Sequence, residues 1–410
     1  MKNSFSMVMV VFAAAVAAKD AHAVNVKPAE PQDVPPLMRT SDGEEIRTAE
    51  RWEKVRRPEI LKTMQEMVYG VRSVERPPDL AFSEAAPAEE CLDGTAVRKR
   101  IRATFSGPGG RGELNFSAWM PKSRRKVPVF VHIAPRPAET AADPAGPRPT
   151  YLLPVRQITS RGYAVVAYYN YEAAPDFFKC PVVSTSGVFK IWGPEDAANR
   201  APTDWGILSA WAWGASRVRD GIETEPMLDA GHAAVVGLSR NGKTALWTGA
   251  TDARFALTVS CCSGMGGAKL NHMSLWGSED VEEIMKPAWR WFCPNFAQWI
   301  GRDRQMPFDQ HWLIALVAPR LVYVSSAAED AWAGPRGEFA SALLASPAWE
   351  LYGKAGLVAS SGFPSVDLPL QAGNVAYHVR SGVHDITEYD WDRYMDFADG
   401  HGFRLGNGAE

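Results

Sequence analysis

The chain has 410 residues, of which 46% are hydrophobic and 22% charged, and its formal net charge is −3. A chain of this length and composition buries a large core, which excludes a disordered chain and favours a soluble protein. The near-neutral balance supplies no basic stripe for nucleic acid or for an anionic membrane, so we expect neither as a partner.

The first 23 residues have the pattern of an export signal. Lys2 supplies a positive start, residues 7–18 form a short apolar stretch, and residues 21–23 (Ala-His-Ala) fit a small-x-small cleavage site. The apolar stretch is too short to span a bilayer. We therefore expect a secreted or periplasmic protein that begins near Val24, with residues 24–45 as an extended lead-in.

The next elements mix helix and strand. Residues 51–69 have helical spacing and end at Gly70, and the alternation over residues 97–119 predicts paired strands. Short apolar runs then predict buried strands at residues 127–133, 162–168, 233–237, 256–260, 320–325 and 375–379. Helical patterns separate them at residues 205–222, after a cap-like Thr203-Asp204, and at residues 242–250, 312–316 and 392–399.

Apolar strands that alternate with helices predict a mostly parallel sheet covered on both faces. We expect one α/β domain over residues 46–405, a three-layer sandwich of the α/β-hydrolase type. The segment 264–309 is rich in Trp and Pro. It is typical of an elaborated insert over the strand ends, where such folds build their sites.

The strongest local signal surrounds Ser239. A strand leads directly into Gly237-Leu-Ser239-Arg-Asn-Gly-Lys243, and a helix follows. This pattern predicts a nucleophile elbow, a sharp turn that projects the serine Oγ from the sheet. The usual second glycine is displaced by one position and replaced by Asn241, a residue that tolerates a positive φ. The backbone N–H of Arg240 is expected to donate to a developing oxyanion. An ordinary helix N-cap serine is the alternative.

The partners of Ser239 are expected later in the chain, on the strand ends that follow it. His384 lies in a turn after the last predicted strand, whereas His378 lies within that strand, so His384 is the predicted general base. The acid is expected after the strand 320–325, where Glu329 and Asp330 are adjacent. Asp330 is our choice, Glu329 the fallback, and two solvated loop charges the alternative.

The chain has five cysteines: Cys91, Cys180, Cys261, Cys262 and Cys293. An odd number in an exported protein leaves at least one unpaired within a monomer. Cys261 and Cys262 are adjacent, so their side chains point in opposite directions if that segment is a strand. No spacing is typical of zinc ligands, and no metal site is expected.

These residues carry a resemblance to the glucuronoyl esterases, carbohydrate esterase family 15, in their bacterial branch. Arginine directly after the nucleophile is uncommon among hydrolases in general. The resemblance extends over residues 50–402 through further motifs: Asp204-Trp-Gly, Trp211-x-Trp213-Gly, Ser263-Gly-x-Gly-Gly267, Trp291-Phe-Cys293, Pro307-Phe-Asp-Gln-His311, Ala318-Pro-Arg320, Asp330-x-Trp332-Ala-x-Pro335-Arg-Gly-Glu-Phe339, Tyr377-His-x-Arg380 and His384-Asp-x-Thr387-x-Tyr-Asp-Trp391.

The resemblance implies a serine esterase, without a cofactor, that cleaves esters between the 4-O-methylglucuronic acid of xylan and lignin alcohols. It implies Ser239 as nucleophile and His384 as base, with the charge of Arg240 added to the oxyanion site. Lys243 and Glu279 correspond to positions that hold the uronic-acid ring in the family. Trp332 corresponds to a position that stacks against the ring, and Trp291 to a further pocket position. We expect a monomer, although the sequence leaves the oligomeric state, the disulfides and the preferred alcohol open.

Two positions depart from the family pattern. Many members carry the catalytic acid as a Glu after the strand that follows the elbow helix, and Cys262 occupies that position here. A neutral thiol cannot stabilise an imidazolium as a carboxylate does, so the acid role is expected to fall on Asp330. The segment 133–137 (Ile-Ala-Pro-Arg-Pro) also lacks the small, Asn- or His-bearing turn of the family, so an unusual pocket rim is expected there.

Three rival functions share these residues. Another carbohydrate esterase, such as an acetyl xylan esterase, would use the same triad, but a pocket cation at Lys243 and an acceptor at Glu279 suit the hydroxyls of a uronate ring. A catalytically silent sugar-binding protein is a second rival, because the family's Glu is displaced. A peptidase is disfavoured because nothing indicates a side-chain specificity pocket.

Overall fold

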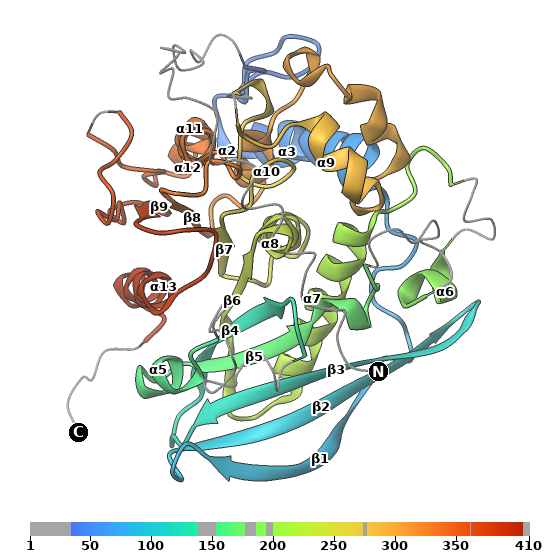
Figure 1. Cartoon of the computed structure of the whole chain (residues 1–410), viewed down its shortest axis with the longest axis vertical. Helices are drawn as coiled ribbons and strands as arrows, with labels where there is room; N and C mark the ends of the chain where they lie inside the picture. The colour runs from blue at the N-terminus through green and yellow to red at the C-terminus, as the bar shows by residue number, and fades with distance from the viewer. Residues whose placement is uncertain are drawn as a thin grey trace, which may run out of the picture.

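The computed structural model describes residues 34–137, 153–176, 186–193, 200–273, 277–360 and 362–404. The predicted export signal and Cys180 lie outside this part of the chain. In these described ranges nine strands form one sheet, in the order β1-β2-β3-β5-β4-β6-β7-β8-β9 (Figure 1). Their bounds are β1 Ala81–Cys91, β2 Ala96–Gly107, β3 Gly110–Pro121, β4 Val127–Ala134, β5 Ala164–Tyr169, β6 Leu228–Leu238, β7 Leu257–Cys261, β8 Leu321–Ala327 and β9 Val375–Arg380.

The sheet has an antiparallel part and a parallel part. Strands β1, β2, β3 and β5 pair antiparallel, whereas all pairs along β5-β4-β6-β7-β8-β9 are parallel. The carboxyl ends of the parallel strands therefore lie at one edge, and loops that follow different strands can meet there. Strand β4 is buried along its whole length, as its continuous apolar run predicts.

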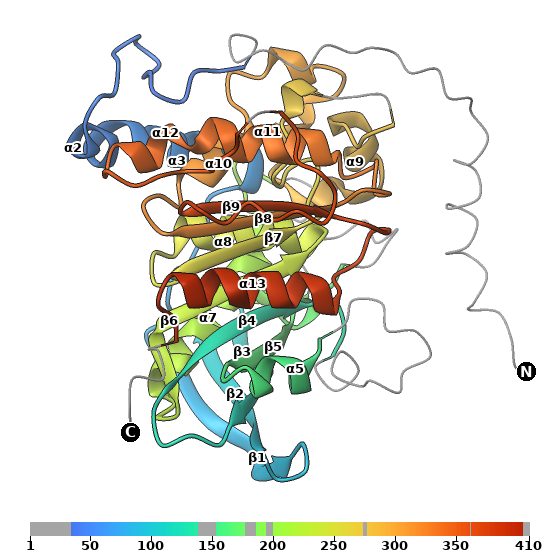
Figure 2. The ribbon, with the colours of Figure 1, turned by 90° about the vertical axis from the view of Figure 1, so that its left-hand side faces the viewer.

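Helices cover both faces of the sheet and make a three-layer sandwich, which confirms the predicted fold class (Figure 2). Val129, Val131 and Ile133 of β4 pack into one core with helices α3, α7, α8, α10 and α11. Phe130 and Ala134, which point the other way, pack into a second core with α5 and α13. The helix bounds are α3 Arg57–Met64, α5 Val155–Ser160, α7 Ile207–Thr224, α8 Arg240–Thr251, α10 Gln310–Ala315, α11 Pro335–Ala345 and α13 Glu388–Gly400.

Several boundaries differ from those predicted. Helix α7 begins at Ile207 after Gly206, so Thr203-Asp204 do not cap it. Helix α13 begins four residues before the predicted 392, because Thr387 and Asp390 form a capping box. Strand β1 and helices α5 and α11 were not predicted. Strand β1 is mostly exposed and rich in Ala and Glu, so its sequence lacks the apolar alternation of a strand.

The lead-in contacts the domain over its second half, residues 34–45. Arg56 is 2% exposed, and its guanidinium donates to the carbonyl oxygens of Leu37 (2.8 Å) and Pro36 (2.9 Å). The same guanidinium lies 4.1 Å from the ring centre of Trp312. These contacts hold residues 36–37 against the core that α3 and α10 share.

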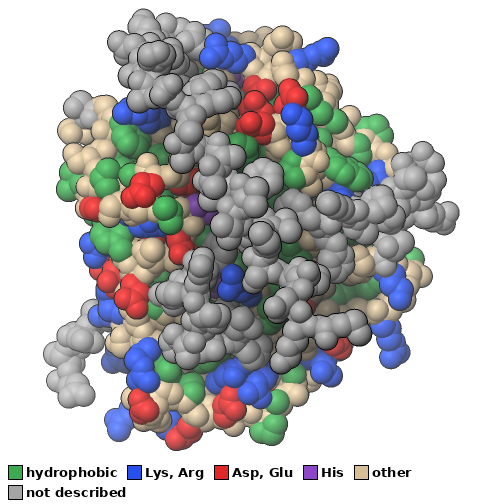
Figure 3. Space-filling view, in the orientation of Figure 1, with side chains coloured by type: hydrophobic (Ala, Val, Ile, Leu, Met, Phe, Trp, Pro, Cys, Tyr) green, Lys and Arg blue, Asp and Glu red, His purple; other side chains and the backbone are tan. Residues whose placement is uncertain are grey.

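The predicted insert between β7 and α10 contains helix α9 (Val281–Ala288), short 3-10 turns, and Glu279 and Trp291. Among the described residues, no helix is long and apolar enough to cross a membrane. Lys/Arg and Asp/Glu side chains are interspersed on the described surface that Figure 3 shows.

Candidate active site

Ser239 lies on a strained turn between β6 and α8. Its backbone has φ +60° and ψ −129°, and α8 begins at the next residue. Its N–H donates to the carbonyl of Cys261 at the end of β7 (2.8 Å), which fixes the turn to the sheet edge. A Cβ on Gly237 would lie 2.1 Å from the Asn241 carbonyl oxygen, so the crossing of strand and helix requires glycine there. These features are those of a nucleophile elbow.

Asn241 does not have the positive φ that its place in the motif suggested, because that conformation belongs to Ser239. Asn241 lies inside α8, and its amide donates to the Ile133 carbonyl (2.9 Å). Its side-chain oxygen accepts a hydrogen bond from the amide of Asn170 (2.9 Å). The buried amide therefore ties the elbow helix to the ends of β4 and β5.

His384 and Asp330 form a hydrogen-bonded pair beside the elbow. His384 follows β9, Asp330 follows β8, and the Nδ1–Oδ2 distance is 2.5 Å. Asp330 is 5% exposed, whereas the neighbouring Glu329 is exposed. Of the two carboxylates that the sequence left open, only Asp330 contacts the histidine. His378, by contrast, is buried in β9 and bonds Asp390 (2.9 Å) and Tyr323 (2.9 Å).

Cys262 occupies the third position around this pair. It has φ +45°, and its Sγ lies 3.9 Å from the Sγ of Cys261. The two side chains therefore do not point apart, because the strand ends at Cys261 and the backbone turns. The hydrogen bond with Cys261, burial and nearby carboxylates raise the pKa of the Cys262 thiol well above its ordinary value. The thiol is neutral and cannot replace the carboxylate of Asp330.

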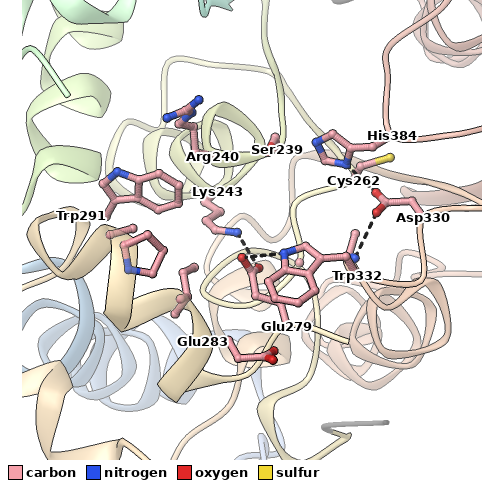
Figure 4. A pocket seen from close by; sticks show the side chains of 15 residues that line it. Ser239, Arg240, Lys243, Cys262, Glu279, Glu283, Trp291, Asp330, Trp332 and His384 are labelled. Atoms are coloured by element: carbon pink, nitrogen blue, oxygen red, sulfur yellow. Dashed lines mark hydrogen bonds and ion pairs between the residues drawn. The ribbon is translucent and has the colours of Figure 1, made fainter. Parts of the chain in front are cut away.

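Lys243, Glu279 and Trp332 form a second group in the same pocket (Figure 4). The Lys243 ammonium is 3% exposed and donates to the Ser263 carbonyl (2.5 Å) and to Glu279 Oε2 (3.1 Å). The indole of Trp332 donates to Glu279 Oε1 (3.2 Å) yet is 48% exposed. The three side chains thus place a cation, an acceptor and an accessible aromatic face together.

Asp176 anchors the opposite wall, and the sequence did not indicate it. Its Oδ2 accepts from the guanidinium of Arg240 (2.9 Å) and from the indole of Trp291 (2.9 Å). Arg290 adds a longer ion pair of 3.6 Å. Asp176 is 4% exposed, so the carboxylate holds both pocket side chains from behind. It follows an irregular segment, and no periodic pattern marks it.

Glu338 supports the pocket loop from inside the fold. It is 0% exposed, and its carboxylate accepts from the backbone of Ser263 (2.6 Å) and Gly264 (2.9 Å) and from the hydroxyl of Ser326 (2.6 Å). Burial raises its pKa to about 7. The motif after Trp332 contains Glu338, but only the structure shows that this residue holds the loop that contacts Lys243.

One cavity of about 400 Å³ brings all eight predicted site residues together. They are Ser239, Arg240, Lys243, Glu279, Trp291, Asp330, Trp332 and His384, and Figure 4 shows them around the same space. Cys262, Gly264 and Glu283 are among the other lining residues. A serine on an elbow, a histidine–aspartate pair and two cations around one space have the chemistry for acyl transfer from an ester.

Comparisons with known proteins show which family the chain resembles. The family profile "Glucuronyl esterase, fungi" matches residues 154–353. "Carbohydrate esterase MZ0003", from an unknown prokaryotic organism, is 33% identical over 396 residues, which are 90% of this chain and 89% of that protein. The solved glucuronoyl esterase from Solibacter usitatus is 34% identical, with a TM-score of 0.78 over 90% of this chain and 97% of the other.

A fungal relative, the 4-O-methyl-glucuronoyl methylesterase of Podospora anserina, matches a shorter stretch. It is 35% identical over 156 residues, which are 36% of this chain and 32% of that protein. The carbohydrate esterase MZ0003 and the Solibacter structure thus each match 90% of this chain, whereas the Podospora protein matches 36% of it.

Proposed function

The chain belongs to the glucuronoyl esterases, carbohydrate esterase family 15, and from this premise we propose that Ser239, His384 and Asp330 carry out its ester hydrolysis. The observation that carries the proposal is the cavity in which Ser239 and the His384–Asp330 pair lie beside Lys243 and Glu279. The substrate class is a 4-O-methylglucuronoyl ester.

The reaction follows from the roles that the geometry supports. His384 accepts the Ser239 proton as Oγ attacks the ester carbonyl, and Asp330 stabilises the imidazolium that forms. The backbone N–H and the guanidinium of Arg240 stabilise the oxyanion. His384 then returns the proton to the departing alcohol, and water hydrolyses the acyl-enzyme by the same steps in reverse order.

Lys243, Glu279 and Trp332 select the acyl part of the substrate. Lys243 donates to hydroxyls of the uronate ring, Glu279 accepts from them, and the exposed face of Trp332 stacks on the ring. Trp291 contributes the opposite wall, held by Asp176. Because the ring carries several hydroxyls and a simple acetyl group carries none, these contacts favour a uronate ester over an acetyl ester.

The biological setting belongs to the same proposal. The alcohol is a lignin alcohol, the uronic acid is a xylan branch, and the enzyme acts outside the cytoplasm after loss of residues 1–23. It works as a monomer without a cofactor. The family membership and the export pattern at the start of the chain support this setting.

The test compares kcat/KM on a methyl 4-O-methylglucuronate ester and on a small activated acetate for wild type and Lys243→Ala. Loss of a hydrogen bond to a charged group costs about 1–3 kcal/mol. That cost is expected on the uronate ester alone, since the acetate does not reach the ring contacts. The ratio of the two constants does not depend on how much of the variant is folded.

Lys286→Ala is the matched control, since this lysine lies on α9 with its side chain 68% exposed and paired with Glu282. It should leave the ratio unchanged. An equal loss on both substrates for Lys243→Ala would mean that the lysine supports the fold or the oxyanion site. A wild-type preference for acetylated xylan would overturn the uronate assignment in favour of an acetyl xylan esterase.

A further inference from the structure

Three different metal-ligating groups converge where the sequence showed no zinc spacing. Cys262, Asp330 and His384 each present one ligand atom, and these atoms lie within 4.8 Å of one another. They come from the ends of three adjacent strands, β7, β8 and β9. Far separation in the chain explains why no spacing rule detects them.

We propose that Cys262, Asp330 and His384 bind a thiophilic divalent cation such as Zn²⁺, and that this cation inhibits the enzyme. The thiolate, imidazole and carboxylate are the ligand set that Zn²⁺ prefers, and three protein ligands leave a fourth position for water from the cavity. The set depends on Cys262, which supplies the thiol beside the His384–Asp330 pair.

The distances allow this with small movements. In a tetrahedral zinc site, ligand atoms lie about 3.3–3.8 Å apart, given metal–ligand bonds of about 2.0–2.3 Å. The present Nδ1–Oδ2 contact of 2.5 Å must therefore widen by about 1 Å as the cation enters. His384 has 32% of its side chain exposed and can move toward the cavity.

The charges around Cys262 favour a cation. The buried Asp330 carboxylate lies beside the Cys262 thiol, and its negative charge stabilises a divalent cation at the sulfur. Binding releases the Cys262 thiol proton to solvent, and the ring proton that His384 carries on Nδ1 moves to Nε2. No electron is transferred.

Inhibition follows from where the cation binds. Nδ1 is the nitrogen that faces Asp330, so a metal there leaves the one remaining ring proton on Nε2. A protonated Nε2 cannot accept the proton of Ser239. The binding part of the inference is independent of the proposed function, whereas the inhibition rests on His384 being the base.

The test uses the full chain after chelator treatment, with Cys262→Ala and the matched control Cys261→Ala. Added Co²⁺ should give a near-ultraviolet thiolate-to-cobalt absorption band in wild type and in Cys261→Ala, and no band in Cys262→Ala. In the uronate-ester assay, Zn²⁺ should inhibit wild type reversibly, with activity restored by chelator. Its inhibition constant should rise at least about 100-fold in Cys262→Ala, more than the usual effect of losing an outer-shell partner.

Each rate is expressed relative to the rate of the same variant without metal. A change in basal activity therefore does not affect the measured inhibition. If Cys262→Ala fails to fold, Cys262→Ser replaces it. No cobalt band in wild type, equal Zn²⁺ sensitivity in wild type and Cys262→Ala, or loss of the band in Cys261→Ala would each overturn the proposal. The last result would assign the metal to the adjacent thiols. The band needs no substrate, so its absence is distinguishable from failure of the proposed function.

Discussion

Asp330 and Glu329 are neighbours in the chain, but only Asp330 can support an imidazolium, because only Asp330 is buried against His384. We expect Asp330→Asn to lower kcat by about 10²–10⁴-fold, since a neutral amide neither stabilises the charged ring nor selects its tautomer. Cys262→Ala should cost less than about tenfold, or 1.4 kcal/mol. Steady-state kinetics on one uronate ester checks both.

Glu329→Gln is the matched control, because it removes a carboxylate one residue away that is exposed. It should leave kcat near the wild-type value. A larger loss for Cys262→Ala than for Asp330→Asn would show that the acid role is not where the proposal puts it.

Glu338 makes stability depend on pH. Its folded pKa of about 7 is above its ordinary value of 4.5, so between those two values the folded state binds more protons than the unfolded state. Stability is therefore fully present below about pH 4.5 and declines as pH rises to about 7. In Glu338→Gln, which stays neutral, this decline should be smaller by about 1–3 kcal/mol.

Urea unfolding at pH 5 and pH 8 measures the effect. Glu282→Gln removes an exposed carboxylate on α9 and should keep the wild-type pH dependence. The same pH dependence in Glu338→Gln as in wild type would mean that Glu338 is ionised in the folded protein at both pH values.

Single residues differ in how far their sequence context predicts them. Ser239 and His384 stand next to backbone signals, a strand that meets a helix and a turn after a strand, so local pattern was enough to select them. Asp176 and Glu338 act through hydrogen bonds to partners more than 60 residues away, 64 for Arg240 and 75 for Ser263. Pairings at that distance depend on the tertiary fold and leave no local pattern.

Among the elements, the elbow between β6 and α8 is sterically crowded at Gly237. We expect Gly237→Ala to destabilise the protein by more than about 2 kcal/mol, because its Cβ would meet backbone atoms that cannot move without breaking α8. Gly231→Ala in the same strand is the control, since its Cβ would lie 3.3 Å from a flexible Asp229 side chain. Thermal unfolding compares the two, and equal melting temperatures would contradict the crowding argument.

At the scale of elements, buried strands were predictable and exposed ones were not. Strands β4, β6 and β8 are mostly apolar along their buried residues, and this nearly continuous run itself predicts a buried strand. Strand β1 forms by hydrogen bonding to β2 and buries little. Nothing in its own composition requires that pairing, so this outermost strand of the antiparallel part could be seen only in the structure, whereas the alternation over residues 97–119 did predict β2 and β3.

For the whole molecule, the second half of the lead-in has a measurable role. A chain that begins at residue 41 should be less stable than one that begins at residue 34 by about 2 kcal/mol or more. The chain that begins at residue 41 lacks the buried Leu37 and the two carbonyl oxygens that accept hydrogen bonds from the Arg56 guanidinium. Chemical unfolding of the two chains checks this, and equal stabilities would show that the segment only lies against the domain.

The distribution of tryptophan determines which indole fluorescence a quencher in water can reach. Seven of the indoles that the structure describes are fully buried: Trp52, Trp205, Trp211, Trp213, Trp247, Trp349 and Trp391. Trp332, at the cavity, is 48% exposed. A small neutral quencher in water collides with exposed rings far more often than with buried ones. Trp289 is 37% exposed, so among the described indoles the quenchable emission should come mainly from Trp332 and Trp289. A sugar stacked on the Trp332 ring would shield it, and fluorescence could then report occupancy of the cavity without any reaction taking place.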